Sequence, residues 1–110
     1  MVESNRQPRV AQAAGVILRQ IRVERKLSLR QVTIRSDGRF KPSSVASYER
    51  GERQLSLERL FELAGVYEVA PESIVAVIRR RLESSREERD ARSSLNDGAD
   101  VRAQMIDARS

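Results

Sequence analysis

The chain has 110 residues and carries 21 Lys or Arg against 16 Asp or Glu, but it contains neither cysteine nor histidine. Without these two residue types, disulfides, ordinary zinc sites and the hydrolytic mechanisms that use Cys or His as nucleophile or base are excluded. No apolar run approaches the ~20 residues of a membrane span, and the N-terminus, MVESNRQPRV, lacks the hydrophobic segment of a secretory signal.

Positive charge is concentrated in the first part of the chain. Residues 1–82 hold 16 Lys or Arg against 9 Asp or Glu, a net charge of +7, whereas residues 83–110 hold 5 against 7, a net charge of −2. A basic domain favours a polyanionic partner, with nucleic acid ahead of anionic lipid. A positive balance also serves solubility, so the charge alone leaves both interpretations open.

Apolar residues recur at helical spacing along most of the chain, and no segment alternates in the manner of a strand. A first helix is predicted over about 9–25. Its apolar face consists of Val10, Ala14, Ile17 and Ile21. Ser28 and Gln31 have the spacing of a capping box, which predicts a second, short helix over about 28–35. This helix is expected to bury Val32 and Leu29.

The segment SDGRFKP ends the second predicted helix and leads into the third. Asp37 and Gly38 are typical of a turn, and Pro42 suits the first position of a helix. A third helix is therefore predicted over about 42–50, and Gly51 is placed to end it.

Two further helices complete the predicted domain. Ser56 caps the fourth helix, and Pro71, with Glu72 in the first turn, starts the fifth. The predicted apolar face of the fourth helix consists of Leu57, Leu60, Phe61, Ala64 and Tyr67. The apolar residues of the fifth helix are Ile74, Val75, Val77, Ile78 and Leu82. Five short helices predict a compact all-α fold.

The helical pattern dissolves after Leu82 into the polar stretch SSREERDARSSLNDGAD. We therefore divide the chain into a flexible N-terminus over 1–8, a helical domain over 9–83, and a polar tail over 84–110 that is disordered or loosely helical. Only 28 residues follow Leu82, so we expect no separate effector domain.

The second and third predicted helices, joined by a short connection, have the form of a helix-turn-helix. In such a motif one helix lies in the major groove of DNA, and its N-terminal residues meet the base edges. Val45 and Tyr48 are expected to face the core. The outward residues of the same helix are then Ser43, Ser44 and Ser47. Small hydroxyl side chains fit the groove and donate or accept, so these serines are candidate base contacts, although exposed serines are also common solvated surface.

Cations and amide groups around these serines are candidate phosphate contacts. Arg39 and Lys41 precede the third helix, and Arg53 follows it. The first turn of the second helix offers Arg30, Gln31 and unpaired backbone N–H groups, which together suit a phosphate. Isolated surface arginines are common, so this prediction depends on the combination of these cations and amide groups with the serines of the third helix.

From 14 to 75 the chain resembles the lambda-repressor-like helix-turn-helix family, often called the XRE family. The resemblance is carried by GVILRQIRVERKLSLRQV, VASYERGER and SLERLFELAGVYEVAPESI. The stretch GRFKPSSVASYERGERQLSLERLFELAGVYEV is similar to the BldD-like members of that family. The resemblance implies a five-helix, lambda-repressor-like fold with its recognition helix over 42–50. It also implies that the three serines contact bases and that the cations around them contact phosphates.

The family resemblance further implies an internal ion pair between Arg22 and Glu49. Glu49 follows the core-facing Tyr48, so a carboxylate there needs a partner. Two features depart from the common pattern. Leu29 stands where the family usually has a glutamine that touches a phosphate, and the connection before the third helix is longer, as in the BldD-like members.

The family commonly works as a dimer on a two-fold DNA site. The candidate dimer interface lies on the fifth predicted helix and comprises Val75, Val77, Ile78 and Leu82. Ile78 and Leu82 can also face the core, and surplus valines are commonly covered by a neighbouring loop. The basic cluster at 79–81 either complements the helix dipole or approaches the DNA backbone.

These observations predict a cytoplasmic, sequence-specific regulator of transcription that binds double-stranded DNA as a homodimer on a two-fold operator, most often as a repressor. Such a protein is nucleoid-associated when bound and needs no catalysis, metal, cofactor or membrane. The alternative is a protein-interaction adaptor or an antitoxin whose tail, 84–110, folds on a partner protein.

Overall fold

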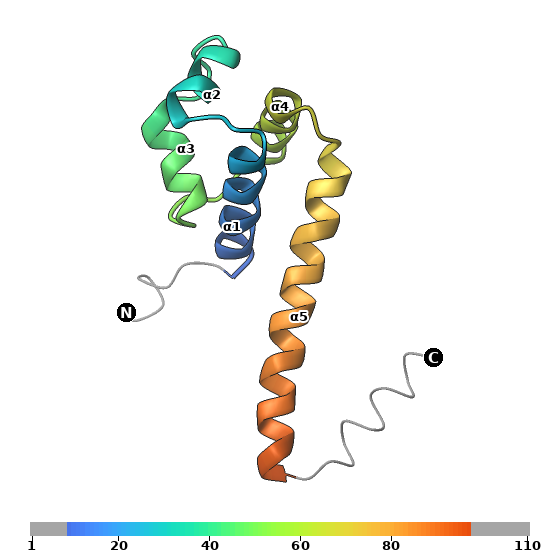
Figure 1. The fold of residues 1–110 in the computed structure, drawn as a ribbon. Helices are drawn as coiled ribbons and strands as arrows, with labels where there is room; N and C mark the ends of the chain where they lie inside the picture. The colour runs from blue at the N-terminus through green and yellow to red at the C-terminus, as the bar shows by residue number, and fades with distance from the viewer. Residues whose placement is uncertain (1–8, 98–110) are drawn as a thin grey trace.

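The computed structural model describes residues 9–97, which form five helices and no strand (Figure 1). The helices are α1 (Arg9–Glu24), α2 (Leu29–Arg35), α3 (Pro42–Glu49), α4 (Leu57–Tyr67) and α5 (Pro71–Asp97). The predicted all-α fold of five helices is confirmed. The predicted flexible N-terminus, 1–8, and the last part of the predicted tail, 98–110, lie outside the described residues.

Local sequence signals set where the short helices begin and end. The Ser28 hydroxyl accepts a hydrogen bond from the Gln31 N–H (3.1 Å), and the Gln31 Oε1 accepts one from the Ser28 N–H (2.7 Å), which is the predicted capping box. Pro42 occupies the first turn of α3. Gly51, with φ +74°, follows its last turn. The Ser56 hydroxyl accepts from the Arg59 N–H (3.0 Å) and caps α4.

A single apolar core lies among the five helices. Its most deeply buried large side chains are Leu18, Val32, Phe40, Val45, Leu63, Tyr67 and Ile74. Burial raises the pKa of the Tyr67 hydroxyl above its usual range. Leu29, the departure from the family pattern, is half-buried against this core, in agreement with its predicted packing.

The apolar faces of α1 and α4 differ from those predicted. Leu57 is 70% and Phe61 57% exposed, whereas Leu63, which the prediction omitted, is fully buried. The buried face of α4 is formed by Leu60, Leu63, Ala64 and Tyr67. Val10 of α1 is also exposed, whereas Leu18 joins the core. The other predicted residues of α4 and Ile17 of α1 are buried, so the predicted stripes had the right period and were displaced only at their edges.

Helix α5 extends well past Leu82, and its second half projects beyond the other helices (Figure 1). Residues 84–97 of the predicted tail therefore continue α5, which agrees with the helical alternative for that part. Arg and Glu are good helix formers, so this segment is helical without a packed face. Between residues 9 and 97, no helix combines the length and the apolar character needed to cross a membrane.

Helices α1 and α3 approach each other most closely at Gly15. A Cβ atom on Gly15 would lie 2.4 Å from the carbonyl oxygen of Glu49 and 2.6 Å from that of Tyr48. Both contacts are to backbone, which cannot move aside as a flexible side chain can. Glycine is therefore required here for the end of α3 to rest directly on α1.

We expect Gly15→Ala to lower the free energy of unfolding by about 1–3 kcal/mol, because the added methyl group forces the two helices apart. Urea denaturation measures the change. Gly65→Ala is the matched control, since the added carbon in α4 has no atom within 4 Å. Alanine's helix propensity should leave the control unchanged or more stable by up to about 1 kcal/mol. Equal effects of the two substitutions would contradict the close approach at Gly15.

Candidate nucleic-acid interface

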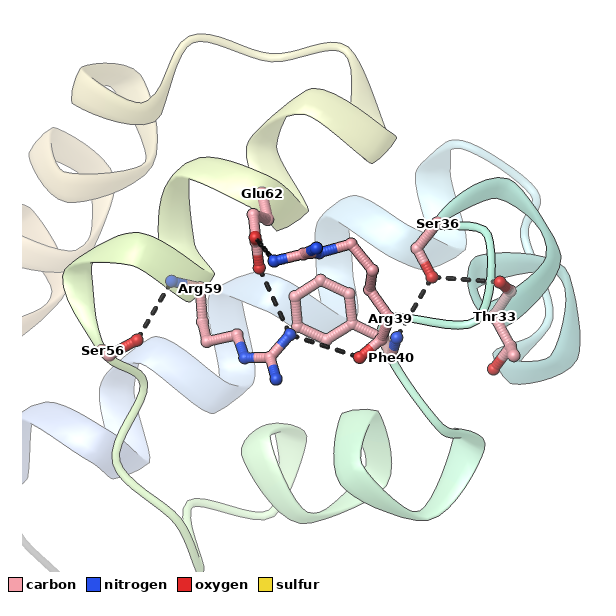
Figure 2. Close-up of polar contacts among 7 residues, drawn as sticks. All are labelled: Thr33, Ser36, Arg39, Phe40, Ser56, Arg59 and Glu62. Carbon is pink, nitrogen blue, oxygen red and sulfur yellow. Dashed lines mark hydrogen bonds and ion pairs between the residues drawn. The ribbon is translucent and has the colours of Figure 1, made fainter.

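The connection between α2 and α3 is tightly organised. Asp37 and Gly38 both have left-handed backbone conformations, with φ values of 55° and 80°. The Ser36 hydroxyl donates to the Thr33 carbonyl (3.0 Å) and accepts from the N–H of Phe40 (3.2 Å), as Figure 2 shows. Phe40 is almost fully buried, so the chain is anchored two residues before α3 begins.

Helix α3 has one face in the core and one towards solvent. Val45 and Tyr48 are buried, as predicted. On the outer face Ser43 is exposed, whereas Ser44 and Ser47 are half-buried. Lys41 is exposed at the N-cap position, where its side chain makes no capping hydrogen bond. The structure thus brings the three candidate base-contacting serines to one side of a short helix that begins beside a free cation.

Arg53 lies against this face and is not a free surface cation. Its guanidinium carbon is 5.4 Å from the centre of the Tyr48 ring, at a distance typical of cation–π contact. Its Nη1 donates to the Ser44 hydroxyl oxygen (3.3 Å). The side chain therefore joins the loop after α3 to the outer face of α3.

The remaining candidate phosphate contacts differ in their surroundings. Arg30 is exposed on the first turn of α2. The Oε1 atom of Gln31 is occupied by the capping box, which leaves its amide N–H groups to donate outward. Arg39 is turned towards α4, where its Nη2 pairs with Oε2 of Glu62. The structure thus places Arg30 and Lys41 as free cations and Arg39 as a partner of Glu62.

Arg22 and Glu49 form a bidentate ion pair between α1 and the last residue of α3. Nε and Nη2 of Arg22 donate to Oε2 and Oε1 of Glu49 at 2.6 and 3.0 Å, and Nη1 donates to the Leu27 carbonyl (2.8 Å). The two side chains are only 12% and 6% exposed. The hydrogen bonds that Arg22 donates to the Glu49 carboxylate raise the pKa of Arg22 above its ordinary value.

Arg59 and Glu62, two residues that the sequence did not indicate, hold the connection before α3. Arg59 of α4 donates through Nη1 to the Arg39 carbonyl and to Oε1 of Glu62, each at 3.2 Å (Figure 2). Its guanidinium carbon lies 4.9 Å from the centre of the Phe40 ring. The spacing of Arg59 and Glu62 on one helix suggests a local pair, but nothing in it indicates a contact with residues about twenty positions earlier.

The family known as Helix-turn-helix matches residues 18–74, from the middle of α1 to the first turn of α5 and over more than half of the chain. The chain belongs to the XRE-type helix-turn-helix family. The predicted helix-turn-helix comprises α2, the connection and α3, and the predicted recognition helix, 42–50, falls on α3, which ends at Glu49.

Three solved structures are similar to this chain. A DNA-binding domain of BldD is 44% identical, with a TM-score of 0.55 over 58% of this chain and 90% of that one. The DNA-binding domain of BldD from S. venezulae is 42% identical, with a TM-score of 0.57 over 61% and 97%. The clp gene regulator ClgR from C. glutamicum shares the fold at 23% identity, with a TM-score of 0.62 over 68% and 95%. No curated protein matches the chain.

The four residues of the candidate dimer interface occupy different environments. Val77 and Ile78 are half-buried against the core, and Leu82 is half-buried beside α1. Val75 is 49% exposed. It lies with Val10 and Leu57, both exposed, in an apolar groove of about 470 Å³ between α1, α4 and α5. Val75 is therefore the member of the set that is open to a partner.

We expect Arg22→Met to lower the free energy of unfolding by about 3 kcal/mol, because it leaves the Glu49 carboxylate buried without its counter-ion. Arg50→Met is the matched control, since it breaks the exposed pair that Arg50 forms with Glu52. The control should leave the melting temperature almost unchanged. Thermal unfolding of both variants makes the comparison, and a small effect of Arg22→Met would show that the ion pair does not hold α3 to α1.

Proposed function

We propose that this protein is a sequence-specific, double-stranded DNA-binding regulator of transcription whose α3 enters the major groove. The observation that carries the proposal is the outer face of α3, where Ser43, Ser44 and Ser47 lie between Lys41 and Arg53. This face has small polar side chains that can approach base edges, and cations at its borders that suit phosphates. The similarity to two structures of BldD DNA-binding domains supports it.

The free cations fit the backbone of a duplex on both sides of α3. Arg30 stands at the start of α2, where the amide group of Gln31 can also donate, and Lys41 stands at the start of α3. Arg53 is held in place by Tyr48 and Ser44. Contacts of this kind fix the register of a reading helix without specifying sequence. A protein with this role acts in the cytoplasm, at the nucleoid.

We further propose that the protein binds a two-fold operator as a homodimer and represses by occupying a promoter. A single domain of this size reads few base pairs, so two copies are needed for a specific site. The apolar groove that contains Val10, Leu57 and Val75 is the surface available to a second copy. The alternative, an adaptor or antitoxin acting through 84–110, has less support because 84–88 of that segment presents exposed polar side chains along α5.

Selection of duplexes from a random library at two salt concentrations tests the function. We expect Ser44→Ala and Ser47→Ala to change the enriched sequence, because hydroxyl groups in the groove meet bases. Lys41→Ala should weaken the binding of all duplexes by the same factor and reduce the slope of log affinity against log salt by about one. Arg86→Ala, an equal change of charge at an exposed position of α5 outside the basic cluster at 79–81, is the control and should leave that slope unaltered. Binding that disappears with salt and enriches no motif would refute base reading and favour the adaptor.

We expect Val75→Asp to weaken self-association by about tenfold or more, because a carboxylate would be buried in an apolar interface. Sedimentation of the free protein measures the dimer constant without DNA. Val23→Asp is the control, since Val23 is about as exposed as Val75 but lies near the C-terminal end of α1, whereas Val10 of the groove lies at the N-terminal end. If the two variants associate equally, the groove is not the dimer interface.

A further inference from the structure

Four side chains join α4 to the connection that leads into α3. We name Arg39, Phe40, Arg59 and Glu62 the α4 latch (Figure 2). The Glu62 carboxylate receives Arg39 Nη2 on one oxygen and Arg59 Nη1 on the other. The same Arg59 Nη1 donates to the Arg39 carbonyl (3.2 Å). The latch therefore holds both the side chain and the backbone of Arg39.

The latch continues through Phe40 into α3. The Arg59 guanidinium covers one face of the Phe40 ring, with its central carbon 4.9 Å from the ring centre. The Phe40 ring meets the Tyr48 ring edge-on, with centres 6.5 Å apart and planes at 72°. Tyr48 belongs to α3 and supports Arg53 on its outer side. An unbroken series of contacts thus runs from α4 to the face that we propose reads DNA.

The start of α3 needs such support from outside. The connection passes through two successive left-handed residues, Asp37 and Gly38, and its last backbone–backbone hydrogen bond before α3 runs from the Arg39 N–H to the Ser36 carbonyl (3.1 Å). Lys41 supplies no side-chain cap for α3. What fixes Lys41 and Ser43 is therefore the anchoring of the two residues just before them.

The negative charge of Glu62 also indicates that this residue positions the connection and does not itself attract DNA. A carboxylate next to the DNA-facing connection repels phosphates and lowers the electrostatic part of the affinity. A protein that binds DNA by charge alone gains nothing from Glu62, whose side chain is 22% exposed. A protein that reads bases gains a fixed start of its reading helix.

We propose that Glu62 and Arg59 are specificity-determining positioning residues that set the place of Lys41 and Ser43 on DNA. The inference rests on the proposed function and deepens it. Arg39 is accordingly an anchor of the connection and not a free phosphate contact, which replaces the role assigned to it from the sequence. Neither Glu62 nor Arg59 needs to touch DNA for this role.

The variant that tests the proposal is Glu62→Gln, which keeps the shape of the side chain and removes its charge. Glu58→Gln makes the same change of charge on the exposed first turn of α4, outside the latch. The measured quantity is the ratio of the affinities for the selected duplex and a scrambled duplex. We expect the ratio to fall about tenfold in Glu62→Gln, which is the size of one lost base contact, and to stay unchanged in Glu58→Gln. Equal ratios in the two variants would overturn the proposal.

Arg39→Ala distinguishes an anchor from a phosphate contact. As an anchor, Arg39 acts through Glu62, so Arg39→Ala should lower the ratio of the two duplex affinities in the wild-type background. In the Glu62→Gln background the same substitution should lower that ratio little further. A free phosphate contact would instead weaken binding to both duplexes by one factor, in both backgrounds. That second result would overturn the assignment of Arg39.

A measurement without DNA separates this inference from the proposed function. In amide NMR spectra of the free protein, Glu62→Gln should shift the backbone N–H resonances of residues 39–41, 43 and 44, and Glu58→Gln should leave them in place. Shifts confined to α4 would refute positioning even if the wild-type protein selects a motif. If the wild-type protein selects no motif, the proposed function fails, and the spectra still decide whether the latch positions the start of α3.

Discussion

The contact between α1 and the end of α3 is the constraint on which the rest of the structure depends. Gly15 lets the carbonyl groups of Tyr48 and Glu49 rest on α1 without an intervening side chain. Such an approach brings Glu49 out of water, and the bidentate hydrogen bonds from Arg22 offset the cost of its desolvation. Because a buried pair tolerates little change in geometry, it fixes the angle of α3 as well as its distance from α1.

The two ends of α3 are held by different physical means. Its C-terminal end is fixed to α1 by close backbone packing and a buried ion pair. Its N-terminal end, which has no cap of its own, depends on the anchoring of Phe40 and on the partly exposed contacts of Arg59 and Glu62. An eight-residue helix is not stable by itself and depends on tertiary packing. The position of the outer face of α3 therefore depends on the contacts at the two ends of the helix.

The sequence was sufficient for features that depend on near neighbours. The capping box at Ser28 and the cap at Ser56 each involve residues three positions apart, and both were predicted. The buried face of α4 was not, because Leu57 and Leu63 both fit a helical period and only packing chooses between them. Residues 84–97 were predicted only as disordered or loosely helical, because the polar half of α5 lacks the apolar period used to predict helices, although its backbone is satisfied within the helix. The contact of Arg39 with Glu62 joins residues that only the fold brings together.

The sequence predicted three serines with equivalent surroundings, but in the structure they differ in exposure and in hydrogen bonding. Ser43 is exposed at the start of α3, whereas the oxygen of Ser44 already accepts a hydrogen bond from Arg53. A hydroxyl group has two acceptor lone pairs and one hydrogen, so Ser44 keeps one lone pair and its hydrogen after it accepts from Arg53. In the proposed groove Ser44 therefore has one acceptor position fewer than a free serine, and it can still donate to the acceptors of a base edge, such as N7 and O6 of guanine or O4 of thymine. The sequence could not supply this asymmetry, because it follows from where Arg53 stacks on Tyr48.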